Sequence, residues 1–505
     1  MRGFLILDFG SQYTQVIARR LRDLGFYSEI VSYKIEIDQI KAKNPFGIIL
    51  SGGPMSVYEA GAPLRDTKEL EKISPILGIC YGFQLLVSQN GGAVQSSQHR
   101  EYGKKIVHWK KQFRKLKKEQ SVWMSHGDVA TKIPDRFQIL AETDHHPAVI
   151  QDKNVLGLQF HPEVFHTEQG EELFLEFAQM CGAEKNWNSA QMSEQIHDFV
   201  KQNVKADEKV LCALSGGVDS TVVATLLHKI LKPGQLQCIF VDTGLLRDQE
   251  AEEVMKAYKT LNLPVIKADA KDLFLGALKN ISDPEKKRKL IGQLFIETFD
   301  GEVKKLNQKF RWLAQGTLYP DVIESVSLHG TSVTIKSHHN VGGLPEKMNL
   351  KVLEPVRYLF KDEVRSLGQT LGIPEPLIQR HPFPGPGLAI RILGEIDSQK
   401  IQILQKADRI YIDFLKEKNL YHKIWQAFCV LLPVQTVGVQ GDSRTYDNAL
   451  VLRAVTSRDG MTADWYEFEM SDLKEVSSRI TNQVKGINRV VYDVTSKPPA
   501  TIEWE

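Results

Sequence analysis

Residues 215–220 read Ser-Gly-Gly-Val-Asp-Ser, between an apolar run at 210–214 and a helix-like run at 221–227. A buried strand, a glycine-rich turn and the start of a helix together present free backbone N–H groups to an anion. The glycines let phosphate oxygens approach the backbone closely, and the serine hydroxyls add further donors. The stretch therefore predicts an α/β fold with a phosphate-binding turn between a strand and a helix.

The chemistry of this turn differs from that of the kinase and GTPase loop. No lysine follows it, so it is not the G-x-x-x-x-G-K-[ST] loop that holds a γ-phosphate. Asp219 adds a carboxylate beside the anion, which is sensible when Mg²⁺ lies between them. An ordinary glycine turn is the alternative interpretation. The residues expected to bind the nucleotide phosphates are Ser215, Gly216, Gly217, Val218, Asp219 and Ser220.

A second candidate site lies upstream, where residues 78–82 read Gly-Ile-Cys-Tyr-Gly. They follow a strand-like stretch at 75–77 and precede a helix-like stretch at 83–87. This is the pattern of a nucleophile elbow with a thiol in place of a hydroxyl: the tight turn exposes the side chain, and the helix N-terminus stabilises a thiolate. Among the five cysteines, only Cys80 has this setting.

A thiolate nucleophile needs a base, and His-Pro-Glu at 161–163 supplies a candidate. The motif closes a strand-like run at 155–160, and positions i and i+2 of an extended backbone point the same way. We therefore expect His161 to face Cys80 while Glu163 orients the imidazole. A strand-terminating turn is the alternative. The competitors for the base role are His126, His145 and His146.

Backbone donors for an oxyanion are expected nearby. Ser-Gly-Gly-Pro at 51–54 follows the strand-like run 46–50 and offers flexible N–H groups. The N–H groups of Gly53 and Tyr81 are the pair we expect to stabilise a tetrahedral intermediate, although 51–54 alone would read as a simple turn.

These motifs occur together in a known family. Residues 1–180 resemble a class I glutamine amidotransferase domain, through Leu-Asp-Phe-Gly-Ser-Gln-Tyr at 7–13 and the motifs already described. The 215–220 turn resembles the pyrophosphate-binding loop of N-type ATP pyrophosphatases, which cut ATP between its α and β phosphates. In one chain, the two resemble the glutamine-hydrolysing GMP synthases. The resemblance continues through Gly-Thr-Leu-Tyr-Pro-Asp at 316–321, Lys-Ser-His-His-Asn at 336–340 and Lys-Pro-Pro-Ala-Thr-Ile-Glu-Trp-Glu at 497–505.

The resemblance implies three domains: an amidotransferase domain at 1–183, an ATP pyrophosphatase domain at 184–384, and a C-terminal dimerisation and XMP-binding domain at 385–505. It implies two doubly wound α/β domains and a C-terminal α+β domain. Ammonia from glutamine would aminate XMP activated as an O2-adenylate, giving GMP, AMP, pyrophosphate and glutamate.

The resemblance also implies roles for single residues. Gln84 would contact glutamine, and Arg288 would lie in a lid over the substrate and bind a phosphate of XMP. The adenylation residues would be Asp321, Glu324 and Lys336. The other XMP-binding residues would be Gln426, Arg489, Lys497, Ile502 and Glu503.

Composition limits the alternatives. The chain has 505 residues, 42% of them hydrophobic, which is enough for about two to four domains. Its 64 Lys and Arg nearly balance 62 Asp and Glu, so charge gives no case for nucleic acid or a membrane surface. No apolar stretch approaches the length of about twenty residues of a membrane span. Five scattered cysteines favour neither disulfides nor zinc, and indicate the cytoplasm.

The expected partners are therefore small molecules: glutamine, ATP with Mg²⁺, and XMP, with a homodimer and no tightly bound organic cofactor. A lysine-rich run at 104–118 could form a nucleic-acid patch, but a solvated hairpin edge is the preferred interpretation. Residues 183–207 are expected to form a partly helical connector. After a Pro- and Gly-rich boundary at 381–387, we expect helical periodicity to give way to strands such as 434–439 and 489–493.

Three rival functions remain to be weighed against this interpretation. An amidotransferase acting on another adenylated acceptor is disfavoured by the 497–505 ending. A tRNA-thiolating enzyme is disfavoured by the balanced charge and by the lack of paired cysteines near the 215–220 turn. A non-catalytic sensor would require loss of Cys80, His161 or Asp219, and all three are present.

Overall fold

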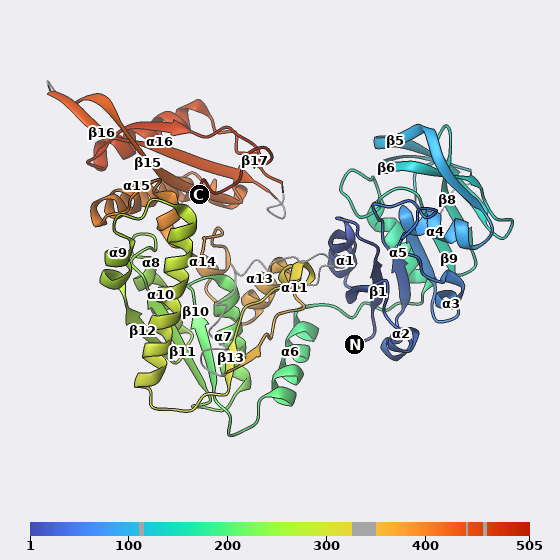
Figure 1. The fold of residues 1–505 in the computed structure, drawn as a ribbon, viewed down its shortest axis with the longest axis horizontal. Helices are drawn as coiled ribbons and strands as arrows, with labels where there is room; N and C mark the ends of the chain where they lie inside the picture. The colour runs from blue at the N-terminus through green and yellow to red at the C-terminus, as the bar shows by residue number, and fades with distance from the viewer. Residues whose placement is uncertain (111–115, 326–349, 441–442, 458–461) are drawn as a thin grey trace. The chain divides into compact units, whose positions relative to one another are not determined.

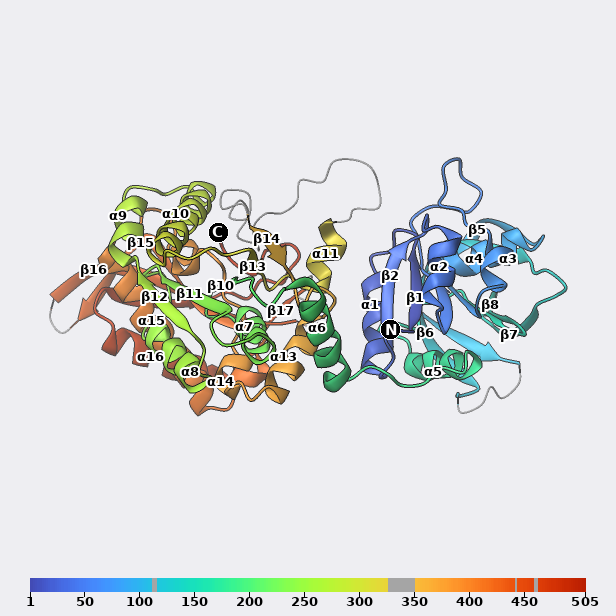
Figure 2. The ribbon, with the colours of Figure 1, turned by 90° about the horizontal axis from the view of Figure 1, so that it is seen from below.

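The computed structural model describes residues 1–110, 116–325, 350–440, 443–457 and 462–505. By their contacts, the described residues form two compact units, one up to Met192 and one from Ser193 onward (Figures 1 and 2). The partly helical connector predicted between them contains α6 (Ser189–Asn203). None of the helices in these ranges has the length and apolar character to cross a membrane.

The first unit is built on one nine-stranded sheet, in the order β2-β1-β3-β4-β9-β8-β7-β5-β6. Its first five strands in this order are parallel, as expected for a doubly wound domain, and the other four join it antiparallel. The strands are β1 (Phe4–Asp8), β2 (Ser28–Ser32), β3 (Gly47–Leu50), β4 (Ile76–Ile79), β5 (Ala93–Trp109), β6 (Glu119–Lys132), β7 (Gln138–Glu142), β8 (Pro147–Asp152) and β9 (Val155–Leu158). The helices are α1 (Thr14–Asp23), α2 (Ile37–Lys43), α3 (Thr67–Glu71), α4 (Tyr81–Gln89) and α5 (Gly170–Met180).

The lysine-rich run at 104–118 falls on the β5–β6 hairpin, with β6 at the edge of the sheet, as predicted for its described part. Trp109, the aromatic residue of this run in its described part, is buried, and its Nε1 donates to Gln120 Oε1 at 3.2 Å. An aromatic ring held inside the hairpin cannot stack on a nucleic-acid base.

The second unit begins with a five-stranded parallel sheet in the order β12-β11-β10-β13-β14. The chain order reverses between β10 and β13, and ligands of such sheets bind at the carboxyl ends of strands beside this switch point. The strands are β10 (Val210–Leu214), β11 (Leu236–Asp242), β12 (Val265–Asp269), β13 (Trp312–Ala314) and β14 (Lys351–Leu353). The helices are α7 (Val218–Ile230), α8 (Glu250–Thr260), α9 (Lys271–Leu278), α10 (Pro284–Lys305), α11 (Tyr319–Ser325), α13 (Lys361–Thr370) and α14 (Glu375–Ile378).

The remainder of the second unit is more helical than the sequence suggested. The predicted strands are present, but α15, a 20-residue helix, and α16 accompany them. The α15 side chains Ile401, Leu404, Ala407, Tyr411 and Leu415 are all buried, at the three- and four-residue spacing of an amphipathic helix. The elements are η1 (Gly387–Arg391), α15 (Ser398–Glu417), η2 (Tyr421–Lys423), β15 (Gln426–Gln440), β16 (Ser443–Thr456), β17 (Asp464–Trp465), α16 (Met470–Gln483) and β18 (Ile487–Tyr492).

One continuous hydrophobic core joins both parts of this unit. Leu211 of β10 and Phe299 of α10 belong to the same buried cluster as Leu404 of α15 and Leu452 of β16. Figures 1 and 2 both place the C-terminus beside α10. The five-stranded sheet that contains β10 and the C-terminal sheet that contains β16 are therefore packed on one shared core.

Candidate active sites

Cys80 occupies the sharp turn between β4 and α4. Its backbone has φ 53° and ψ −102°, a conformation that residues with a side chain rarely adopt, and its N–H donates to Leu158 O at 2.8 Å. A Cβ at Gly78 would lie 2.7 Å from the carbonyl carbon of Gly82, and one at Gly82 would overlap Leu50 O. Both glycines are therefore required by space, as the elbow interpretation predicts.

His161 and Glu163 lie together just beyond β9. His161 Nδ1 and Glu163 Oε1 are 2.7 Å apart, and both side chains are almost fully buried. The expected reason for this contact was wrong, because β9 ends at Leu158 and residues 162–163 form a turn rather than extended backbone. The turn is fixed by Thr167, whose Oγ1 donates to His161 O at 2.6 Å.

The structure brings Cys80 to this pair. Burial acts against a charged imidazole, but the Glu163 carboxylate, together with the charge and hydrogen bond of Cys80, raises the pKa of His161 well above its usual range. Glu163 on Nδ1 and the nearby Cys80 therefore favour the charged form of the imidazole. The three side chains thus have the geometry of a nucleophile, a base and an orienting carboxylate.

A cavity of about 470 Å³ opens over Cys80 and His161. The N–H groups of Gly53 and Tyr81, both residues of its lining, donate to no acceptor within the described ranges, so they are available to an oxyanion. Gln84 also lines the cavity, and its Nε2 donates to Asp128 O at 2.9 Å. Asp128 lines the cavity as well, although no sequence motif indicated it.

The competing histidines have other contacts. His126 lines the cavity, but its Nδ1 contacts Asp128 O at 3.0 Å and its Nε2 lies 3.4 Å from Glu101 Oε2, so both ring nitrogens face groups other than Cys80. His146 Nε2 contacts Ser97 Oγ at 3.3 Å.

The 215–220 turn connects β10 to α7 at the sheet's switch point. Gly216 has φ 78°, a left-handed conformation that favours glycine. Ser215 Oγ accepts from the N–H of Gly217 at 3.3 Å and lies 3.2 Å from Ser220 Oγ. The turn therefore gathers two hydroxyls and the N-terminus of the 13-residue helix α7, an arrangement suited to an anion.

Asp219 has one paired and one unpaired oxygen. Its Oδ2 lies 3.2 Å from Lys361 Nζ, and its Oδ1 is buried without a hydrogen-bond partner in the described part of the chain. An unpaired carboxylate oxygen beside an anion site fits Mg²⁺. No cluster of three or more metal-ligating side chains exists among the described residues. The sequence did not point to Lys361.

The predicted adenylation residues are only partly described. Asp321 lies in the first turn of α11, where its Oδ2 accepts from the N–H of Leu318 at 2.9 Å. Glu324 is in the same helix, but its side chain lies outside the described part, and Lys336 lies outside it altogether.

Some of the predicted XMP residues are brought together. Gln426 Nε2 donates to Glu503 Oε1 at 2.8 Å, and Ile502 is buried beside them in a cluster with Phe428. Arg391, which no sequence pattern indicated, is fully buried and donates to both Glu503 carboxylate oxygens, at 2.8 and 3.1 Å.

Neither arginine among the other predicted XMP residues has a side-chain contact with Gln426 or Glu503 in the described part of the chain. Lys497 pairs through its backbone with Ala463, and Arg489 is exposed on β18. Arg288 lies in the first turns of α10, where its Nε is 3.4 Å from Glu285. Its neighbour Lys287 is fully buried and contacts Glu505 at 2.6 Å, so burial lowers the pKa of Lys287 while the ion pair ties α10 to the end of the chain.

Comparison with known proteins gives the family of each part of the chain. Family models match in chain order: "Glutamine amidotransferase class-I" at residues 5–180, "NAD synthase" at 192–295 and "GMP synthase C terminal domain" at 413–504. The chain is thus a class I glutamine amidotransferase fused to an ATP-using synthetase.

Full-length relatives identify the family to which the chain belongs within this class. The chain is 60% identical over 509 residues to "GMP synthase [glutamine-hydrolyzing]" of Bdellovibrio bacteriovorus, with 100% of both chains covered. It is 53% identical over 513 residues to the protein of that name from Aquifex aeolicus, covering 100% of this chain and 99% of the relative. The solved structure of a putative GMP synthase subunit from Thermoplasma acidophilum is 31% identical, with a TM-score of 0.33 over 36% of this chain and 94% of that one. The chain belongs to the family of glutamine-hydrolysing GMP synthases.

Proposed function

We propose that this chain makes GMP by coupling two half-reactions, glutamine hydrolysis near Cys80 and activation of XMP by ATP near the 215–220 turn. The observation that carries the proposal is the joint presence of a buried thiol, imidazole and carboxylate in one unit and a glycine-rich anion turn in the other. We assign the amidotransferase domain to 1–183, the ATP pyrophosphatase domain to 184–384 and the acceptor and dimerisation domain to 385–505.

In the first half-reaction, the Cys80 thiolate attacks the side-chain amide carbon of glutamine. The oxyanion that forms accepts hydrogen bonds from the N–H groups of Gly53 and Tyr81, and His161 gives its proton to the departing ammonia. Water, deprotonated by His161, then cleaves the glutamyl thioester and releases glutamate. Glu163 holds the imidazole throughout, and Gln84 contacts the bound glutamine.

In the second half-reaction, O2 of XMP attacks the α-phosphorus of ATP, and the bond to the β-phosphate breaks. The turn at 215–220 holds the departing pyrophosphate through its N–H groups and hydroxyls. Asp219 would hold Mg²⁺, which neutralises charge on the phosphates. Ammonia then attacks C2, AMP leaves with O2, and a proton is lost to give GMP. Asp321, Glu324 and Lys336 are assigned to the surroundings of the reacting phosphate.

The acceptor is assigned to the start of β15. Gln426, Ile502 and Glu503 converge there, and the Glu503 carboxylate, held by Arg391, suits the N–H groups of a purine. Arg288, Arg489 and Lys497 are cations suited to the 5′-phosphate, and Arg288 is assigned to a lid that closes over the substrate.

We also propose a homodimer through the outer face of the β15–β16 hairpin. Val437, Val439 and Tyr446 are exposed there, and Val437 is paired with Tyr446 across the two strands. An exposed apolar patch on a strand pair is suited to a second copy of itself. Val439→Glu would make the chain sediment as a monomer; an unchanged sedimentation coefficient would argue against this surface.

The reaction itself is tested with XMP, ATP and Mg²⁺, and either glutamine or ammonium as the nitrogen source. GMP and AMP should form from both sources, and Cys80→Ala should lose only the glutamine-driven reaction. Absence of GMP from both sources would refute XMP as the acceptor, and screening other acceptors for ATP-to-AMP turnover would follow.

The five cysteines, all free, fit the reducing cytoplasm in which we place the reaction.

A further inference from the structure

A network of partly buried polar contacts connects the 215–220 turn with the beginning of β15. It starts at Gly216, whose carbonyl oxygen accepts from Arg380 Nη1 at 2.8 Å. Arg380 Nη2 lies 2.6 Å from Glu250 Oε1, and Glu250 is buried at the first position of α8. The same carboxylate accepts from the N–H of Arg247 through Oε2 at 2.9 Å. Each contact fixes the next residue's backbone or side chain.

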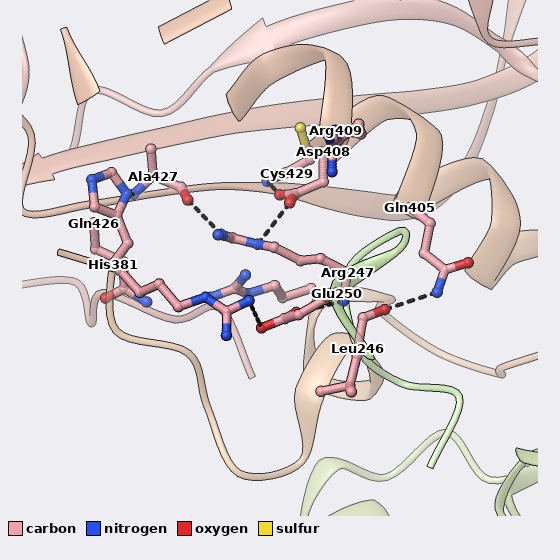
Figure 3. A network of polar contacts seen from close by, with 12 residues as sticks. Leu246, Arg247, Glu250, His381, Gln405, Asp408, Arg409, Gln426, Ala427 and Cys429 are labelled. Carbon is pink, nitrogen blue, oxygen red and sulfur yellow. Dashed lines mark hydrogen bonds and ion pairs between the residues drawn. The ribbon is translucent and has the colours of Figure 1, made fainter. Parts of the chain in front are cut away.

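Arg247 then crosses to the C-terminal part of the unit (Figure 3). Its Nε lies 2.9 Å from Asp408 Oδ2 on α15, and its Nη2 donates to Ala427 O on β15 at 2.9 Å. Burial disfavours the charge of Arg247, but Asp408 and Glu250 outweigh it and raise its pKa. The guanidinium therefore stays charged and contacts both the helix α15 and the strand β15.

The two residues that Arg247 contacts, Asp408 and Ala427, are each held by a further hydrogen bond. Asp408 is fully buried and its Oδ1 accepts from the N–H of Cys429 at 2.9 Å. The N–H of Ala427 donates to His381 Nδ1 at 3.1 Å. Ala427 follows directly on Gln426, the residue that contacts Glu503. Movement of Arg247 would therefore shift the strand that carries the assigned acceptor site.

We propose that Arg247 is a positioning residue that couples nucleotide binding at the 215–220 turn to acceptor binding at Gln426 and Glu503. The proposal rests on the proposed function, because it takes those two places as the ATP and XMP sites. A phosphate bound to the turn fixes Gly216, hence Arg380 and Glu250, and so selects the Arg247 position in which β15 receives XMP. By linkage, XMP must strengthen ATP binding by the same factor.

The chain offers a matched control in Arg409. This arginine joins α15 to α8, through Glu253 at 2.8 Å, and pairs with Asp413 on its own helix. Both of these carboxylate partners lie on the two helices and not on β15. Arg409→Lys therefore weakens another contact of α15, the helix that Arg247 also contacts, without touching the path to Gln426.

The experiment measures the dissociation constant of XMP with and without saturating α,β-methylene-ATP, which cannot be cleaved between its α and β phosphates. We expect the unchanged chain and Arg409→Lys to bind XMP about 5-fold or more tightly with the analogue present. Arg247→Lys keeps the positive charge but cannot contact Asp408 and Ala427 through two separate nitrogens. The ratio of its XMP dissociation constants without and with the analogue should therefore fall toward one. Asp408→Asn, which keeps the oxygen facing Cys429, serves as the second variant if Arg247→Lys does not fold.

The outcomes separate the two proposals. Three outcomes would overturn the role of Arg247 even if the unchanged chain forms GMP. They are coupling that persists in both variants, coupling that is absent from the unchanged chain, and an equal loss of coupling in Arg409→Lys. Failure of the unchanged chain to form GMP from XMP would instead refute the proposed function, and the Arg247 proposal with it. Thermal unfolding midpoints close to that of Arg409→Lys would establish that the effect is not general destabilisation.

Discussion

Glu163→Gln isolates the electrostatic part of the contact with His161. The substitution keeps the size of the side chain and an acceptor oxygen, but it removes the charge that lies 2.7 Å from Nδ1. At that separation, two unit charges attract by about 6 kcal/mol at an effective dielectric constant of about 20. Burying both ions offsets part of this energy, which leaves about 3 kcal/mol for the imidazolium to lose. At about 1.4 kcal/mol per tenfold, glutamine hydrolysis should slow about a hundredfold.

The assay is release of glutamate at saturating glutamine, with ammonium-driven GMP formation measured on the same preparation. Removing the carboxylate also lowers the pKa of His161, so the imidazolium should be lost at a lower pH than in the unchanged chain. Glu101→Gln is the matched control, because Glu101 is another buried carboxylate facing a histidine, His126. A Glu163→Gln rate within about threefold of the unchanged chain, or an equal loss in the control, would refute the reasoning.

Three further outcomes are expected. Burial lowers the pKa of His381 from 6.5 to about 4, so the unfolded chain binds a proton at a higher pH than the folded chain does. The folded state therefore has about 3 kcal/mol of stability from this residue above pH 6.5, and it loses this contribution as the pH falls to about 4. Urea unfolding at several pH values should show this slope, and a His381→Gln variant with the same slope would contradict it. Gly82→Ala should abolish glutamine hydrolysis but not ammonium-driven synthesis, because its Cβ would overlap Leu50 O; full glutaminase activity would exclude the steric argument. Arg391→Gln should raise the KM for XMP about tenfold or more while affecting kcat less, because Glu503 loses a charged two-point contact; an unchanged KM would separate Arg391 from acceptor binding.

The sequence was most informative where chemistry requires a local backbone shape. The turns at Cys80 and Gly216 were predicted because a short apolar strand, small residues and a helix start are adjacent in the chain. The helix α15 was missed, although Ile401, Leu404 and Tyr411 carry its spacing, because the glycine- and proline-rich stretch before it suggested a change to strands.

Long-range partners could not be predicted in the same way. Arg391 contacts Glu503 across 112 positions, and Lys287 contacts Glu505 across 218. An arginine or lysine in such a place looks like any surface cation until the fold brings its partner to it. The His161–Glu163 contact was predicted correctly from two neighbouring residues, yet a turn and not a strand produces it.

The backbone of Cys80 implies a conflict between activity and stability. A side chain held at φ 53° costs about 1–3 kcal/mol, which glycine does not incur. Cys80→Gly and Cys80→Ala both remove the thiol, but only alanine retains the strain, so the glycine variant should melt at the higher temperature. Stability alone would then favour glycine at this position, and the need for a thiol nucleophile favours cysteine.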